Sequence, residues 1–179
     1  LWVQLNPDSR SLIAKAAVFR KPFKRSALPQ TTVSLLPEDK DGMAELPGTL
    51  RASITILLDK NALREAHSFA ADYWLDEGDY VERLHHLLLA NRSLEAQMLL
   101  SARGWQMSRT AGPDLLDSLK GMNDPLPRYA REVRRIKGQA ALRNGDAKFG
   151  HQVAQDMMLT GDADEAIDGL ELKGRMLLL

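Results

Sequence analysis

Histidines and carboxylates are the side chains of this sequence that could do chemistry near neutral pH. There are four histidines, and His85 and His86 are adjacent. On a helix, neighbouring side chains point about 100° apart, so these two cannot share one metal ion well. We expect one of them at the helix surface and the other at its border. Carboxylates are abundant, but no spacing brings two of them to one reaction centre.

The motifs of the common enzyme classes are absent from the sequence. There is no GxGxxG or GxxxxGK[ST] phosphate loop, no HExxH zinc motif and no GxSxG nucleophile elbow. The absence of cysteine removes disulfides, thiolate metal sites and a cysteine nucleophile. We therefore expect a protein that is not an enzyme and that has no metal site and no cofactor.

Charge is segregated along the chain although the 24 basic and 24 acidic residues cancel. Residues 59–79 carry six acids and two bases, residues 128–148 seven bases and two acids, and residues 156–171 six acids and no base. One interpretation is solvated helix faces, with acids at helix starts and bases at helix ends. The other is a charged groove that steers a partner segment. The sequence leaves both open.

Length and composition indicate one ordinary domain or a short piece of a repeat array. The 179 residues are 44% hydrophobic and only 6% aromatic, which is typical of a folded protein with an aliphatic core. No apolar run approaches the roughly 20 residues of a membrane-spanning helix, so we expect a soluble protein, cytoplasmic or periplasmic. Because the first residue is Leu1, we expect a fragment or a processed product.

From Asp59 onward, apolar residues recur at helical spacings of three and four. We expect turns at Gly78, Asn91-Arg92, Gly112, Gly145 and Gly161 and a longer loop over residues 121–127. The apolar series of the helices between them are Leu63, Ala66, Ala70 and Tyr73; Tyr80, Leu84, Leu87 and Leu88; Leu94, Met98, Leu99 and Leu100; Leu115, Leu116 and Leu119; Tyr129, Val133, Ile136 and Ala140; Phe149, Val153 and Met157; and Ala163, Ile167, Leu170, Gly174 and Leu177. Short turns between helices of this length predict antiparallel helical hairpins.

Residues 1–59 form an irregular segment broken by prolines. We expect Asp8 to cap a helix from Ser9 to Arg20. Thr31–Leu36 fits a short extended run or a distorted helix, and Leu50–Leu58 fits a buried helix or a strand. The basic cluster Arg20–Arg25 is expected to be a solvated linker.

Glycines recur with a period near 34 residues. Gly78, Gly112 and Gly145 are spaced by 34 and 33, and Gly104, Gly138 and Gly174 by 34 and 36. Two helices per unit of this length are typical of a helical solenoid, although a bundle with chance glycine spacing remains the alternative.

Three segments resemble tetratricopeptide repeats (TPRs). That family places a small residue in helix A, a bulky residue three positions later and a turn glycine four positions after that. Ala71, Trp74 and Gly78 match this order, Gly138, Ala141 and Gly145 match it with a smaller middle residue, and Gly104 with Met107 matches less closely. The resemblance covers residues 60–179. Thr160-Gly161-Asp162 departs from it, because the expected proline is missing, and residues 1–59 could be a degenerate repeat.

The resemblance implies an all-α fold of antiparallel hairpins stacked as a TPR-like α-solenoid, whose A helices line a concave partner-binding face. Alignment on the small residue places seven residues on that face: Glu65, Ser68, Asp72, Trp105, Arg135, Gln139 and Arg143. The implied function is a non-catalytic scaffold or adaptor that binds a protein segment or subunit. Such arrays also occur in bacterial envelope and secretion assemblies, which is one setting for this chain.

Two other functions stay open. The basic helix 128–148 could bind nucleic acid, although we rank nucleic acid below protein as the partner; such binding would fall steeply with salt and depend on Arg131, Arg134 and Arg135. A helical-bundle enzyme is the third function, and it would need a deep polar pocket with two histidines or close carboxylates.

Overall fold

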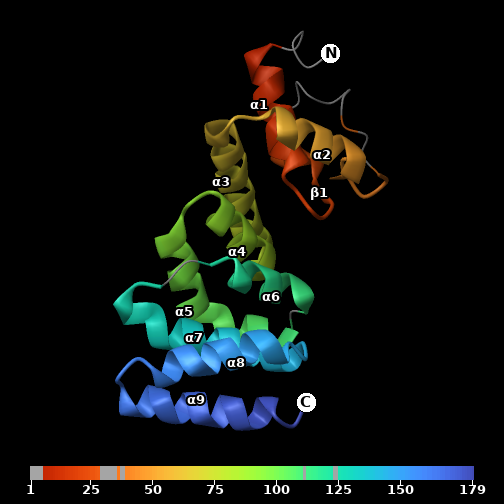
Figure 1. Cartoon of the computed structure of the whole chain (residues 1–179). Coiled ribbons are helices and arrows are strands. Elements are labelled where there is room, and N and C mark those ends of the chain that lie inside the picture. The colour runs from red at the N-terminus through yellow and green to blue at the C-terminus, as the bar shows by residue number, and fades with distance from the viewer. Residues whose placement is uncertain (1–5, 29–35, 37–38, 111, 123–124) are drawn as a thin grey trace. The chain divides into compact units, whose positions relative to one another are not determined.

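The computed structural model describes residues 6–28, 36, 39–110, 112–122 and 125–179. Helices account for 75% of the described residues, which confirms the all-α expectation. The nine α-helices of the described residues have these bounds: α1 Pro7–Ala17, α2 Gly48–Leu57, α3 Lys60–Glu77, α4 Tyr80–Leu89, α5 Ser93–Thr110, α6 Pro113–Lys120, α7 Pro127–Arg143, α8 Ala147–Met158 and α9 Ala163–Met176 (Figure 1).

The helices divide between two compact units. The first comprises the chain up to Asp79 together with Leu89–Asn91, and the second comprises Tyr80–Leu88 and Arg92–Leu179. Helix α3, which the sequence analysis grouped with the repeats, belongs to the first unit, where it packs against α1.

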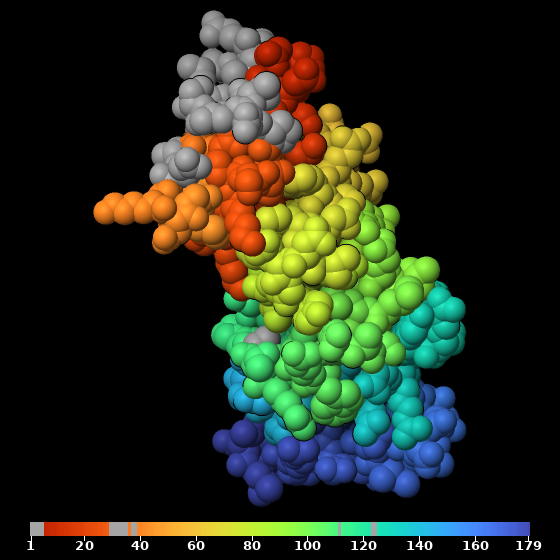
Figure 2. Space-filling view, turned by 180° about the vertical axis from the view of Figure 1, so that it is seen from behind, coloured from red at the N-terminus to blue at the C-terminus, as the bar shows by residue number. Residues whose placement is uncertain are grey.

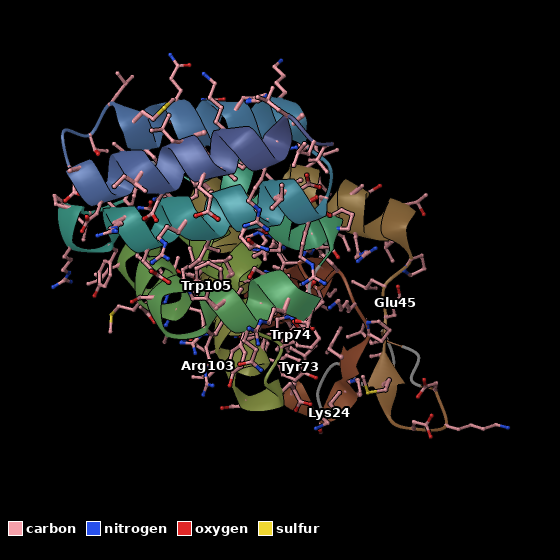
Figure 3. The ribbon with its side chains drawn as sticks, turned by 90° about the horizontal axis from the view of Figure 1, so that it is seen from below. Lys24, Glu45, Tyr73, Trp74, Arg103 and Trp105 are labelled. Carbon is pink, nitrogen blue, oxygen red and sulfur yellow. The ribbon has the colours of Figure 1, made fainter. Side chains whose placement is uncertain are left out.

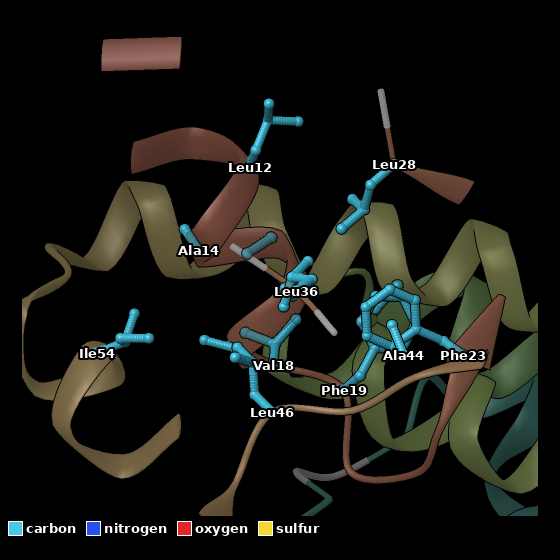
Figure 4. Close-up of a cluster of buried hydrophobic side chains, with 14 of the residues drawn as sticks. Leu12, Ala14, Val18, Phe19, Phe23, Leu28, Leu36, Ala44, Leu46 and Ile54 are labelled. Carbon is cyan, nitrogen blue, oxygen red and sulfur yellow. The ribbon is translucent and has the colours of Figure 1, made fainter. Parts of the chain in front are cut away.

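The first unit is built around an aromatic cluster. Phe19 and Phe23 stack with ring centroids 4.2 Å apart, and Tyr73 of α3 meets the Phe19 ring edge-on at 5.2 Å. Aliphatic side chains of α1, α2 and the connecting segments complete this core (Figure 4). Three aromatic residues, Phe19, Phe23 and Trp74, are among the buried members of this core.

The basic cluster Arg20–Arg25 lies inside this unit, so the solvated-linker expectation is wrong for part of it. Phe23 is completely buried and Arg25 nearly so. Phe23–Lys24 forms β1, which pairs antiparallel with β2, Met43–Ala44. The 3₁₀ turn η2, Arg25–Ala27, follows β1. The backbone N–H of Lys24 donates to the Tyr73 hydroxyl at 2.9 Å, and Figure 3 shows these two side chains as neighbours.

Two other N-terminal expectations are resolved. Helix α1 begins at Pro7, because Asn6 and not Asp8 caps it: the Asn6 side chain accepts a hydrogen bond from the N–H of Ser9 at 2.7 Å. Residues 48–57 form a helix, α2, rather than a strand. The prediction for Thr31–Leu36 lies outside the described residues except for Leu36, which is buried.

Neighbouring helices of the second unit pack as antiparallel hairpins. Helix α7 packs on both α5 and α8, and α9 packs on α8 and α7 (Figure 1). The glycine turns are as expected: Gly145 and Gly161 adopt left-handed conformations with φ of +66° and +80°, which glycine adopts without steric cost. Buried Val133, Ile136 and Ala140 form the apolar face of α7.

Within the described ranges, no helix is long and apolar enough to cross a membrane.

Candidate functional site

Close helix contacts at two glycines position the candidate site. A Cβ atom on Gly104 of α5 would lie 2.2 Å from Cδ1 of Ile136 on α7. A Cβ atom on Gly138 of α7 would lie 2.5 Å from Cδ2 of Leu172 on α9. With the side chains as they lie, a Cβ atom at either glycine would overlap the end of an aliphatic side chain of the next helix but one, so the two glycines allow these helices to approach closely. Helices α5, α7 and α9 are thereby held in a common register.

The residue after each of the three spaced glycines lines one shared pocket. These residues are Trp105, Gln139 and Arg175, and the pocket has a volume of about 100 Å³. The rest of the lining comes from the same three helices and from α8: Arg135, Met157, Asp168, Glu171 and Leu172. The pocket is therefore a product of the helix register.

The indole of Trp105 is the apolar surface of this site. The side chain of Trp105, labelled in Figure 3, is 41% exposed. The Arg135 guanidinium carbon lies 5.6 Å from the centroid of its ring, a cation–π distance. Arg135 is also held by Asp168, whose Oδ2 is 3.6 Å from its Nε. A half-exposed indole beside a charged, positioned side chain is a surface suited to a polar segment with an apolar anchor.

Two of the three charged segments of the sequence, residues 128–148 and 156–171, form ion pairs with each other between α7 and α9. Arg134 Nε lies 2.5 Å from Glu165 Oε1, and Glu165 is only 4% exposed. Arg131 donates to Asp168 Oδ2 at 3.2 Å, and this hydrogen bond raises the pKa of Arg131 above its ordinary value. Basic residues of 128–148 thus face acids of 156–171 within the same unit, an arrangement that neither sequence interpretation included.

The structure brings together three of the seven predicted site residues. Trp105, Arg135 and Gln139 line the same pocket, while Arg143 is exposed on α7 outside the pocket lining.

The remaining three predicted residues lie on α3 in the first unit. Glu65 lines a pocket of about 340 Å³ together with Arg10 and Lys15 of α1. Asp72 lines another pocket of about 340 Å³ beside Tyr73. Ser68, which lies between Glu65 and Asp72 in the sequence, is half-buried.

Sequence reasoning missed the contribution of α9. The spacing between Gly138 and Gly174 is 36 residues, and adding 36 to Arg135 and Gln139 gives Glu171 and Arg175. Continuing the alignment by one more glycine repeat would therefore have identified Glu171 and Arg175.

The adjacent histidines occupy different environments from those expected. His86 is completely buried, with Nε2 at 4.0 Å from Oε2 of the equally buried Glu82, whereas His85 is half-buried. The expectation of a surface and a border histidine is therefore wrong for His86. No group of three or more histidine or acidic side chains in the part of the chain that the structure describes could hold a metal ion.

Comparison with known proteins identifies no relative: no protein-family model matches the chain, and neither the curated proteins nor the solved structures contain a match.

Proposed function

We propose that the protein is a non-catalytic interaction module that binds a segment of another protein in the pocket formed by α5, α7 and α9. The observation that carries this proposal is the lining of one pocket by Trp105, Gln139 and Arg175, each of which follows a glycine of the 34- to 36-residue spacing. A repeated register that directs equivalent side chains to one surface is how solenoid repeats build extended binding faces.

A TPR-like solenoid is the proposed arrangement of the second unit. The close approaches at Gly104–Ile136 and Gly138–Leu172 support it, since successive A helices of a solenoid would pack on each other in this way. In this arrangement α6 and α8 are the B helices. On α3 we propose the same role, contact with the partner, for Glu65, Ser68 and Asp72.

The chemistry of the pocket favours a protein partner of mixed polarity. Two arginines, Arg135 and Arg175, are balanced by Asp168 and Glu171 around the indole of Trp105. An apolar anchor on the partner would cover the indole, while its polar groups would pair with the surrounding charges. A subunit or peptide of a larger assembly, such as a bacterial envelope or secretion complex, supplies this kind of surface.

Nucleic-acid binding through the basic helix is the second candidate. It needs arginines directed at phosphates, but Arg131 and Arg134 already donate to Asp168 and Glu165. Breaking these pairs would oppose binding, and for this reason we rank the protein partner first. A salt titration separates the two, because affinity for phosphates falls steeply with salt.

Selection of short random peptides by phage display tests the proposed function. Enriched peptides should bind the wild-type protein at moderate salt and lose about tenfold or more in affinity for Trp105→Ala. Leu159→Ala is the matched control, because Leu159 is 75% exposed and outside the pocket lining. Equal binding to wild-type protein and Trp105→Ala would contradict the proposal, as would selection that enriches no peptide.

A further inference from the structure

The last helix carries an apolar stripe that no described residue of the second unit covers. The sequence predicts one apolar helix series through Ala163, Ile167, Leu170, Gly174 and Leu177, and all five residues are exposed. Ile167 is 63% exposed, Leu170 59% and Leu177 72%. The buried residues of α9 are Glu165, Gly169 and Met176 instead. Figures 1 and 2 show α9, in blue, as an outer layer of its unit.

Helix α5 contains the same series at a place where a helix does cover it. Leu100, Gly104 and Met107 of α5 have the same spacing as Leu170, Gly174 and Leu177 of α9. In α5 all three are buried, and the space over Gly104 is filled by Ile136 of α7. In α9 no described atom lies within 4 Å of the position that a Cβ on Gly174 would take.

The α5–α7 contact therefore defines what fits α9. The occupant is a helix that places an aliphatic side chain over Gly174 and packs an apolar face against Leu170 and Leu177, as α7 does on α5. Charge points the same way: α7 carries six basic residues and one acid, while α9 carries four acids and two basic residues. Two of these acids, Asp164 and Glu171, are exposed. Their ion pairs with Arg131 at 3.7 Å and with Arg175 at 3.8 Å are solvent-exposed, so exchanging them for a base of the partner costs little.

We propose that the outer face of α9, defined by Ile167, Leu170, Gly174 and Leu177, is a second binding surface, and that its partner is a basic amphipathic α-helix of the α7 type. None of these four residues lines the Trp105 pocket, to which α9 contributes Asp168, Glu171, Leu172 and Arg175. The aliphatic side chain of the partner fills the space over Gly174, and its bases meet the acids of α9.

The α7 sequence itself is the direct probe, as a labelled synthetic peptide of residues 127–143. A hydrocarbon staple through positions 134 and 138 keeps the isolated peptide helical, since short helices are only marginally stable in water. Those positions lie on the side that meets α9 and not α5 in the protein. The control peptide carries Ile136→Ala, which preserves charge and removes the aliphatic side chain that fills the glycine space.

Fluorescence anisotropy of the labelled peptide measures its binding to the intact protein and to three variants. Gly174→Leu fills the space over the glycine and should weaken binding about tenfold or more. Because that position is open and helical, the substitution should not unfold the protein. Lys173→Ala changes the neighbouring exposed residue, and Trp105→Ala removes the indole of the pocket; both should leave peptide binding within about twofold of wild type.

Two results would overturn the proposal. One is equal affinity for the wild-type and Ile136→Ala peptides, or for wild-type protein and Gly174→Leu. The other is a dimer, detected by sedimentation without peptide and abolished by Gly174→Leu, because the occupant would then be a second copy of the chain.

Discussion

The side chain of Ile136 occupies the place that a side chain on Gly104 would need. The two residues belong to alternate helices, α7 and α5, and a Cβ on Gly104 would lie only 2.2 Å from Cδ1 of Ile136. Ile136 is completely buried, so it has little room to move aside. This contact sets the approach of α7 to α5 and, through it, the position of Arg135 beside Trp105.

Substitution of this glycine should destabilise the second unit. Alanine is the better helix former by about 1 kcal/mol, but forcing a methyl group into a filled site costs about 1–3 kcal/mol. We expect Gly104→Ala to lower the free energy of unfolding by about 1 kcal/mol, measured by urea denaturation with far-ultraviolet circular dichroism.

The matched control is Gly174→Ala, at the equivalent position of α9. With open space above it, this variant should gain up to about 1 kcal/mol from helix propensity. If both variants change stability by the same amount in the same direction, the close contact at Gly104 is not what requires glycine there.

Loss of the Arg134 guanidinium should be costly because Glu165 is buried. Arg134→Ala would leave a nearly inaccessible carboxylate without its 2.5 Å partner, and breaking such a pair costs about 3–5 kcal/mol. The exposed Arg131 also pairs with acids of α9, yet exposed pairs contribute only about 0–1 kcal/mol. Chemical denaturation should therefore separate Arg134→Ala from Arg131→Ala by at least about 2 kcal/mol. Equal losses would show that burial of Glu165 does not matter.

Acid should weaken the second unit at the start of α8. The Asp146 carboxylate accepts from Lys120 Nζ at 2.6 Å and from the N–H of Phe149, and these hydrogen bonds lower its pKa below the ordinary value. A lowered pKa in the folded state stabilises the protein above the unfolded-state pKa, and this stabilisation disappears as pH falls through the folded-state pKa. We expect the loss below about pH 4.

Asp146→Asn isolates this effect, because asparagine can still cap the helix but does not titrate. The difference in unfolding free energy between wild type and Asp146→Asn should shrink as the pH is lowered from neutral to below 4, in urea denaturation series at several pH values. A difference that stays constant over that range would contradict the assignment.

The sequence predicted the helices of the second unit well because local signals agree there. Apolar spacing in α7 and left-handed glycines at Gly145 and Gly161 identify the hairpins without any knowledge of contacts. At the N-terminus two neighbouring polar residues, Asn6 and Asp8, can each cap a helix, and local sequence does not choose between them.

Tertiary burial was not predictable from the same patterns. Periodicity shows that Ile167 and Leu170 share a face, but it does not show whether another helix covers that face. Phe23 lies among basic residues, so its burial depends on the pairing of β1 with β2 and on the ring of Tyr73, which are long-range contacts. Part of the site was found because the glycine spacing is periodic; the α9 residues were missed because the alignment stopped one repeat early.

The most direct test of the proposed function follows the indole of Trp105 itself. In a proton–nitrogen NMR titration with a peptide selected on the wild-type protein, the Trp105 indole resonance, assigned by its loss in Trp105→Ala, should shift progressively and saturably. The indole resonance of Trp74, which is only 6% exposed, should stay in place. A peptide that binds while the Trp105 resonance remains unchanged would contradict the central claim that α5, α7 and α9 form the binding surface.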